Sequence, residues 1–241
     1  MKMELDGIEG LVAVVTGGAR GIGLRMVERF RDLGARTASL DLVPEAVEGV
    51  LSVQVDVGDE GSVDRAFAEV ERELGVPQLV VLNAGVLHKA PIEEHTLSDW
   101  QRVIDVNLTG PFLCARRVLG GMRGEGYGRL VVVGSSAGIN GAGAAPPALP
   151  AYAASKAGAM ALAKSIALEY APFGVTANAV APTLIDTGML STLDADFRST
   201  IPVGRYGRPE EVADLVVFLC SAHSGYITGD VVDINGGYLI D

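Results

Sequence analysis

The stretch TGGARGIG at residues 16–23 decides the fold of this chain. It follows the apolar run 11–15 directly and leads into a helical pattern that begins at Ile22. Glycines allow a tight turn and a close approach of the backbone to a phosphate, and the free amides of a helix N-terminus carry partial positive charge. Glycine spacing alone also fits a turn that binds nothing. Its place in the first strand–helix unit favours a turn that binds a dinucleotide pyrophosphate.

Short apolar runs alternate with helical patterns along the rest of the chain. Continuous apolar runs are typical of parallel strands that are covered on both faces of a sheet. The predicted strands are residues 11–15, 37–40, 51–55, 79–82, 130–133, 175–180 and 231–234, and the predicted helices are residues 22–33, 60–74, 97–123, 151–170 and 210–221. This order predicts an α/β fold with a single domain over residues 1–241, a Rossmann-type, doubly wound, parallel seven-stranded sheet with helices on both faces.

One acidic residue bears on the choice of dinucleotide. Asp41 ends the second predicted strand, 18 residues after Gly23. A carboxylate there can accept hydrogen bonds from both hydroxyls of the adenosine ribose, and it repels a 2′-phosphate. Arg20 favours the opposite choice, because a guanidinium in the glycine turn could pair with that phosphate. We expect the carboxylate to dominate, and therefore predict NAD rather than NADP as the cofactor.

Composition and charge disfavour several classes of function. The formal net charge is −11, and no Lys/Arg cluster with interleaved aromatic residues is present, so nucleic-acid binding is disfavoured. The first ten residues lack the basic-then-apolar layout of a signal peptide, and no apolar run approaches the roughly 18 residues of a membrane helix. We therefore expect a cytoplasmic protein that has no membrane partner.

Cysteine and histidine spacing gives no sign of a metal centre. Cys114 and Cys220 stand far apart in apolar segments, and we expect both to be buried thiols. His88, His95 and His223 form no metal-binding pattern. We predict no catalytic metal.

Several further motifs follow the predicted strands in a fixed order. They are Asp56 after the third strand, Asn83-Ala84-Gly85 after the fourth, Asn107 within the long helix, and Tyr152 four residues before Lys156. Together with the glycine turn, they closely resemble the short-chain dehydrogenase/reductase family over essentially the whole chain. Each motif is common by chance, but their shared order and their placement relative to the strands make the combination specific.

The pair Tyr152 and Lys156 carries the chemistry that the resemblance implies. Four residues apart in a helix, the two side chains lie on one face, one turn from each other. A free phenol has a pKa of about 10, so it needs a nearby cation to act as a base at neutral pH. By resemblance, Tyr152 exchanges a proton with the substrate hydroxyl while the nicotinamide exchanges hydride, and Lys156 also binds the nicotinamide ribose. This implies a NAD-dependent oxidoreductase that interconverts a secondary alcohol and a ketone.

Two more catalytic positions follow from the resemblance. A serine after the strand at 130–133 can donate a hydrogen bond to the substrate oxygen. We predict Ser135 rather than Ser136, because only Ser135 has the family's glycine three residues later, at Gly138. Asn107 lies in a run that forms helix poorly, and we expect a local distortion there. In the family such an asparagine holds a water that connects the lysine to solvent.

The resemblance also implies an extended set of cofactor contacts. Residues 178–187 resemble the family segment whose main chain and final threonine contact the nicotinamide carboxamide. The complete predicted set is Gly17, Arg20, Gly21, Ile22, Gly23, Asp41, Asp56, Val57, Asn83, Ala84, Gly85, Tyr152, Lys156, Pro182, Ile185 and Thr187.

The chain departs from the family pattern near the expected substrate entrance. Tyr152 lies 17 positions after Ser135, which is more than usual, so we expect an insertion at about residues 141–150. Thr183 stands where the family generally has glycine, which predicts a restricted backbone and a crowded nicotinamide pocket. A substrate-covering loop is expected at about residues 183–208. Because these segments determine specificity, the sequence does not name the substrate beyond a small-molecule alcohol or ketone.

Three other functions compete with this interpretation. Similarity to 3-oxoacyl carrier-protein reductases is high over the whole chain, but Asp41 and the lack of a basic docking patch for an acidic carrier protein argue against that activity. A non-catalytic regulator that senses dinucleotide would not need the intact Asn, Ser, Tyr and Lys positions. A purely structural or interaction module would leave both the glycine turn and the Tyr–Lys pair unexplained.

We also expect a homotetramer. Family members commonly form tetramers, and the small residues of the predicted helix at 151–167 would permit close helix packing between subunits.

Overall fold

The computed structural model describes residues 7–141, 149–187 and 196–240. Most of the expected insertion at 141–150, and the part of the expected substrate loop at 188–195, lie outside the described residues.

Within these residues, seven parallel strands form one sheet in the order β3-β2-β1-β4-β5-β6-β7. The strands are β1 (Val12–Thr16), β2 (Arg36–Asp41), β3 (Leu51–Gln54), β4 (Leu79–Leu82), β5 (Gly128–Val133), β6 (Val175–Pro182) and β7 (Val231–Ile234). The chain runs outward from β1 to β3 and then returns to the other side of β1 at β4, so the direction of winding reverses between β1 and β4. This is the predicted doubly wound sheet, whose ligand sites lie at the carboxyl ends of the strands near the reversal.

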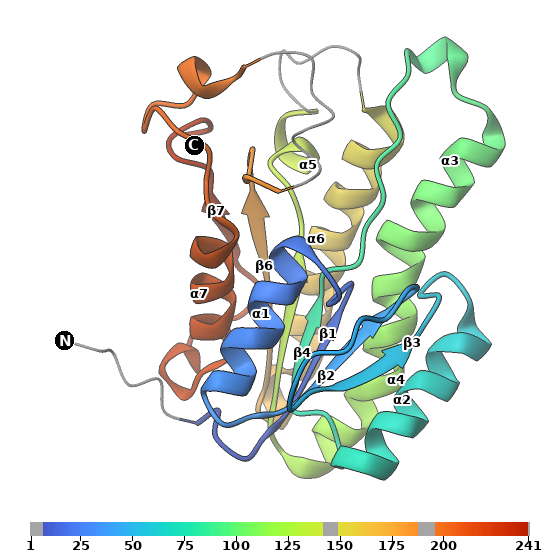
Figure 1. The fold of residues 1–241 in the computed structure, drawn as a ribbon, viewed down its shortest axis with the longest axis vertical. Coiled ribbons are helices and arrows are strands. Elements are labelled where there is room, and N and C mark those ends of the chain that lie inside the picture. The colour runs from blue at the N-terminus through green and yellow to red at the C-terminus, as the bar shows by residue number, and fades with distance from the viewer. Residues whose placement is uncertain (1–6, 142–148, 188–195, 241) are drawn as a thin grey trace.

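Helices cover both faces of the sheet (Figure 1). On one face α1 (Gly21–Asp32) and α7 (Pro209–Cys220) pack side by side, and on the other lie α2 (Glu60–Leu74), α4 (Gly110–Glu125) and α6 (Pro150–Tyr170). The shorter helical segments are α3 (Leu97–Ile104), α5 (Ala137–Asn140), η1 (Ile92–Glu94), η3 (Ala171–Phe173), η5 (Arg198–Thr200) and η6 (Ala222–Ser224).

The predicted helix at 97–123 is interrupted in the middle. A π-helical turn, η2 (Asp105–Thr109), lies between α3 and α4. The run forms helix poorly, and the buried Asn107 side chain bonds the backbone of Val86, outside its own helix. The expected distortion at Asn107 is therefore confirmed.

The two faces of the sheet carry separate hydrophobic cores. Phe67 and Met122 are fully buried under the face covered by α2, α4 and α6, and Phe30 is fully buried under the face covered by α1 and α7. Burial of each such side chain contributes about 1.5–3 kcal/mol. Cys114 and Cys220 are both buried, as predicted, and burial raises the pKa of each thiol to about 12. Packing in the two cores fixes the positions of the carboxyl ends of the strands, where ligand sites of such a sheet lie.

No helix in the described ranges is both long and apolar enough to cross a membrane.

Candidate active site

The turn between β1 and α1 depends on glycine at three positions. Gly17 and Gly21 have φ angles of 67° and 55°, in the left-handed region that favours glycine. A Cβ atom at Gly23 would lie 1.9 Å from the carbonyl oxygen of Gly17, so α1 can begin against the turn only without a side chain there. The first turn of α1 holds no acidic residue, and Arg20 makes no side-chain cap. Its amides are therefore available to an anion.

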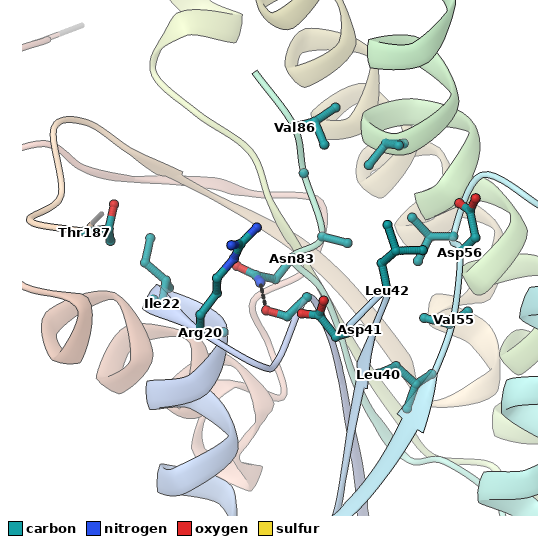
Figure 2. A pocket seen from close by; sticks show the side chains of 17 residues that line it. Arg20, Ile22, Leu40, Asp41, Leu42, Val55, Asp56, Asn83, Val86 and Thr187 are labelled. Carbon is teal, nitrogen blue, oxygen red and sulfur yellow. Dashed lines mark hydrogen bonds between the residues drawn. The ribbon is translucent and has the colours of Figure 1, made fainter. Parts of the chain in front are cut away.

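A cavity of about 670 Å³ lies beside this turn, at the carboxyl ends of the central strands (Figure 2). Its volume is in the range of small-molecule sites. Most of the predicted cofactor residues line it: Gly17, Arg20, Gly21, Ile22, Gly23, Asp41, Asp56, Val57, Asn83, Ala84, Gly85 and Thr187. Sequence reasoning missed its apolar wall, which is formed by Leu40, Leu42, Val55, Val86 and Val106. Leu42 and Val55 adjoin Asp41 and Asp56 at strand ends, a position that could have indicated them.

The Asp41 carboxylate is held in place at the cavity by two backbone amides. Ala19 N donates to Oδ2 at 3.1 Å, and Val43 N donates to Oδ1 at 3.2 Å. Each oxygen keeps acceptor capacity for a further donor, such as a ribose hydroxyl. Arg20, which immediately precedes α1, extends its side chain into the same cavity (Figure 2).

Asn83 joins the end of β4 to the glycine turn. Its Nδ2 donates to the carbonyl oxygen of Thr16 at 3.0 Å. It also donates to the carbonyl oxygen of Gly17 at 3.0 Å (Figure 2). Its backbone amide donates to Thr16 Oγ1 at 3.0 Å. Asn83 therefore supports the shape of the turn as well as lining the cavity.

Tyr152, Lys156 and Ser135 come together where β5 meets α6. Tyr152 is partly buried, and Lys156 is only 5% exposed. Lys156 Nζ donates to the carbonyl oxygen of Val133 at 2.8 Å and lies 5.7 Å from the centroid of the Tyr152 ring. A Cβ atom at Gly85 would lie 3.4 Å from Lys156 Nζ, so the lysine adjoins the wall of the cavity.

Burial shifts both titratable groups toward their neutral forms. It raises the pKa of Tyr152, while a hydrogen bond with Ser135 opposes the rise. It lowers the pKa of Lys156 to about 8. The carbonyl of Val133, rather than the phenol oxygen, receives the Lys156 hydrogen bond. In the protein alone, the contact that favours the phenolate is therefore the one with Ser135.

The structure favours Ser135 over Ser136 and explains the glycine three residues later. Ser135 bonds Tyr152, whereas Ser136 is 5% exposed and immediately precedes α5. A Cβ atom at Gly138 would lie only 2.6 Å from the backbone nitrogen of Ala157. The glycine thus allows α5 to pack directly on α6, which brings the serine and the tyrosine together.

The Asn107 side chain is fully engaged within the protein. It is 0% exposed; Oδ1 accepts from Val86 N at 2.8 Å, and Nδ2 donates to Val86 O at 2.9 Å and to Ser155 Oγ at 3.2 Å. A Cβ atom at Gly85 would lie 3.4 Å from both Asn107 Oδ1 and Lys156 Nζ. All four predicted catalytic residues therefore lie around the end of β4 and the start of α6.

Comparison with known proteins agrees with this geometry. A family model described as Enoyl-(Acyl carrier protein) reductase matches residues 17–239. The 3-oxoacyl-[acyl-carrier-protein] reductase MabA of Mycobacterium bovis is 40% identical over 228 residues, which cover 93% of this chain and 91% of the relative. A short-chain type dehydrogenase/reductase from Mycobacterium marinum superposes with a TM-score of 0.92 at 30% identity, covering 99% of each chain. The chain belongs to the short-chain dehydrogenase/reductase family.

A second solved structure bears on the cofactor. The 3-ketoacyl-(acyl-carrier-protein) reductase from Brucella melitensis, complexed with NADH, has a TM-score of 0.89 at 30% identity and covers 97% of this chain and 100% of its own. As a short-chain dehydrogenase/reductase, this chain is an oxidoreductase that acts on CH–OH or C=O groups, and a nicotinamide dinucleotide is the cofactor typical of its family.

The residues of this short-chain dehydrogenase/reductase fit such a cofactor. The turn leaves space for a ligand at Gly21, which lines the cavity, because a Cβ atom there would meet no atom of the described residues closer than 3.8 Å. Free helix amides suit a pyrophosphate, and the Asp41 carboxylate suits a ribose. The apolar walls that include Leu42 and Val106 suit the flat faces of heterocyclic rings.

The segment after β6 is the part of the site where the structure and the prediction agree least. Thr187 lines the cavity, but Pro182 and Ile185 do not, and Ile185 is buried against Gly207. Thr183 Oγ1 is buried without a hydrogen-bond partner in the part of the chain that the structure describes. The next residue, Leu184, has a φ of 46° and is the one non-glycine residue with positive φ in that part. The strained backbone thus lies one residue after the threonine.

Proposed function

We propose that this short-chain dehydrogenase/reductase interconverts a secondary alcohol and the matching ketone, with NAD as its cofactor. The observation that carries the proposal is the convergence of Ser135, Tyr152 and Lys156 beside the cavity, at its Gly85 wall. A sensor without turnover would not need a serine, a phenol and a buried ammonium close together at one place.

Three protein side chains have separate roles in the proton transfer. When bound, the nicotinamide supplies the carbon that exchanges hydride, and its oxidised form adds positive charge. Tyr152 takes the hydroxyl proton during oxidation and returns it during reduction. Ser135 donates a hydrogen bond to the same substrate oxygen and stabilises its developing negative charge. The Lys156 charge favours the phenolate form of Tyr152.

The position of Asp41 supports NAD over NADP. Its carboxylate is held at the cavity by two amides, where it can accept hydrogen bonds from ribose hydroxyls and repel a 2′-phosphate. Among the described residues that line the cavity, Arg20 is the cation that could reverse this preference.

Reduction of a 3-oxoacyl thioester is the second candidate. The similarity to MabA favours it, and the Brucella relative pairs that activity with NADH, so a preference for NAD does not count against it. The formal net charge of −11 does count against docking of an acidic carrier protein.

We further propose that the protein is a homotetramer. Leu97 on α3, Phe112 on α4 and Leu168 on α6 are 80%, 45% and 86% exposed. These apolar side chains come from neighbouring helices on one face of the sheet, where a second copy could cover them.

A substrate panel tests the reaction class and the cofactor together. Secondary alcohols, ketones and 3-oxoacyl thioesters, the last both free and on a carrier protein, are assayed by NADH absorbance with NAD(H) and with NADP(H). We expect turnover with alcohols or ketones and a higher kcat/KM with NAD(H). An equal or higher kcat/KM with NADP(H) would show that Asp41 does not determine the cofactor preference. Faster turnover of carrier-bound 3-oxoacyl groups would favour the second candidate.

Tyr152→Phe tests the catalytic group. We expect kcat to fall by about 10²–10⁴-fold, the usual contribution of a positioned acid–base group, while the Kd for NADH stays within a few-fold. Tyr170→Phe, a change of the same size on the same helix, is the matched control and should leave kcat unchanged. Turnover by Tyr152→Phe at the wild-type rate would end the proposed mechanism.

A further inference from the structure

A buried hydroxyl lies between the two catalytic residues of α6. Ser155 is 0% exposed and follows Tyr152 by three residues and precedes Lys156 by one. Its Oγ donates to the carbonyl oxygen of Tyr152 at 2.7 Å and accepts from Asn107 Nδ2 at 3.2 Å. The hydroxyl therefore has a partner on each side, one in its own helix and one in the π-helical turn.

The chain of hydrogen bonds continues from Asn107 to the wall of the cavity. Asn107 holds both the amide and the carbonyl of Val86, at 2.8 and 2.9 Å, and Val86 lines the cavity. The path Val86–Asn107–Ser155–Tyr152 thus joins three segments that are far apart in the sequence. All the side-chain atoms on this path are buried, where hydrogen bonds are strong and few alternative partners exist.

A bond from a helical serine to the carbonyl three residues earlier is common by itself and needs no functional reason. Ser221, at the end of α7, makes the same bond to Phe218 O at 2.7 Å and is also 0% exposed. Ser155 differs in its second hydrogen bond, which it accepts from Asn107. That bond connects the helical turn of Tyr152 to the residue that holds Val86 at the cavity wall.

We infer that Ser155 is a positioning residue, which holds the Tyr152–Lys156 turn of α6 in register with the dinucleotide cavity through Asn107. It contacts neither substrate nor cofactor. Without its hydroxyl, Asn107 Nδ2 loses one acceptor and the Tyr152 turn loses its link to Val86. Because misplacement of a catalytic group by about 1 Å can cost about 10²-fold in rate, the effect should appear in kcat.

Ser155→Ala tests this role. We expect kcat to fall at least tenfold, while the KM and Kd for the dinucleotide change by less than threefold, because the glycine turn and Asp41 are untouched. In the oxidation direction, kcat should rise with pH as Tyr152 loses its proton. The midpoint of that rise should move to higher pH in the variant, because Ser135 and Lys156 are no longer aligned with the phenol.

Ser221→Ala is the matched control. It removes a buried hydroxyl with the same bond in its own helix, remote from the catalytic residues. We expect both variants to lower the melting temperature by a similar amount, and only Ser155→Ala to lower kcat and shift its pH profile. A kcat within twofold of wild type for Ser155→Ala, or an equal loss of kcat in both variants, would overturn the inference.

Because this inference rests on the proposed function, Tyr152→Phe is measured beside Ser155→Ala. An inactive Tyr152→Phe with a fully active Ser155→Ala would remove only the positioning role. An active Tyr152→Phe would remove the proposed mechanism and the positioning role with it.

Discussion

Lys156 is a costly residue for the folded protein to bury. It is 5% exposed, its ammonium bonds a neutral carbonyl at Val133, and no ion pair to it is found within the described ranges. Burial accordingly lowers its pKa from the ordinary value of 10.5 to about 8. A residue that lowers stability in this way is typical of a functional site, where position matters more than folding energy.

Lys156→Met should therefore stabilise the fold in a pH-dependent way. Below pH 8 the folded protein carries the full cost of the buried ammonium, and between pH 8 and 10.5 the folded state releases its proton before the unfolded state does. The wild-type free energy of unfolding gains from this group as the pH rises through that window. Since a tenfold change in proton affinity is worth about 1.4 kcal/mol, the advantage of the variant should be on the order of 3 kcal/mol at pH 7 and vanish above pH 10.5.

Urea unfolding at a series of pH values measures this difference, with Lys164→Met as the control. Lys164 is an exposed lysine on the same helix, so its replacement should give no comparable pH dependence. A stability difference between Lys156→Met and wild type that stays constant from pH 7 to 10.5 would contradict the assigned pKa.

At the scale of elements, the join between β1 and α1 is the tightest constraint on the cavity. Gly23 lets the first turn of α1 touch the carbonyl of Gly17, and Asn83 bonds that same carbonyl from the end of β4. Three elements therefore meet at one backbone oxygen. The shape of the pyrophosphate site depends on all three.

Gly23→Ala should displace the start of α1 from the turn that follows β1. The added methyl group would lie 1.9 Å from Gly17 O, so the backbone must move, at a cost of about 1–3 kcal/mol in unfolding free energy. Affinity for NADH should fall at least tenfold, because the amides of α1 no longer converge on the turn. Fluorescence titration of NADH and urea unfolding measure the two effects.

Gly120→Ala is the matched control for this change. Gly120 lies within α4, and a Cβ atom there meets nothing within 4 Å. Alanine is the better helix former, so this variant should gain about 0.5–1 kcal/mol and bind NADH as wild type does. Normal NADH binding by Gly23→Ala would show that the turn does not hold the pyrophosphate.

At the scale of the whole molecule, the parallel sheet brings distant residues to one edge. Asp41 ends β2, Asn83 follows β4 and Ser135 follows β5. The strands point the same way, so all three side chains lie at their carboxyl ends. The helices on one face then leave apolar side chains exposed, including Leu168. The arrangement that builds the site also leaves a surface that a second copy could cover.

Leu168→Glu should weaken the proposed tetramer. Four copies of the 25.0 kDa chain have a mass of about 100 kDa, and light scattering should find this mass for the wild type. A charge at an apolar interface is costly, so the variant should dissociate to a smaller species. Arg65→Glu, on the exposed surface of α2, should not change the mass. A wild-type mass of 25 kDa at micromolar concentration would exclude the tetramer.

Much of the fold and of the site could be predicted because the evidence for them is local. The glycine turn, the alternation of strands and helices, and the Tyr152–Lys156 spacing depend on residues within one or two helical turns of each other. Motif order then indicated which strand ends would carry Asp41 and Asn83. These features were found in the structure where they were expected.

The contacts between distant segments could be decided only by the tertiary structure. Three examples are the bond from Asn107 to Ser155, the packing of Gly138 on Ala157, and the place of Val106 in the apolar cavity wall. The residues involved are far apart in the sequence, which gives no sign of these contacts. Likewise, burial raises the pKa of Tyr152 and lowers that of Lys156, and burial is a property of the packed protein. By itself, the sequence determined which groups the protein carries and along which elements, because secondary structure and turns are set by neighbours. Packing of the helices on the sheet decided which of those groups touch and how they titrate, because contact and solvent exclusion depend on the whole fold.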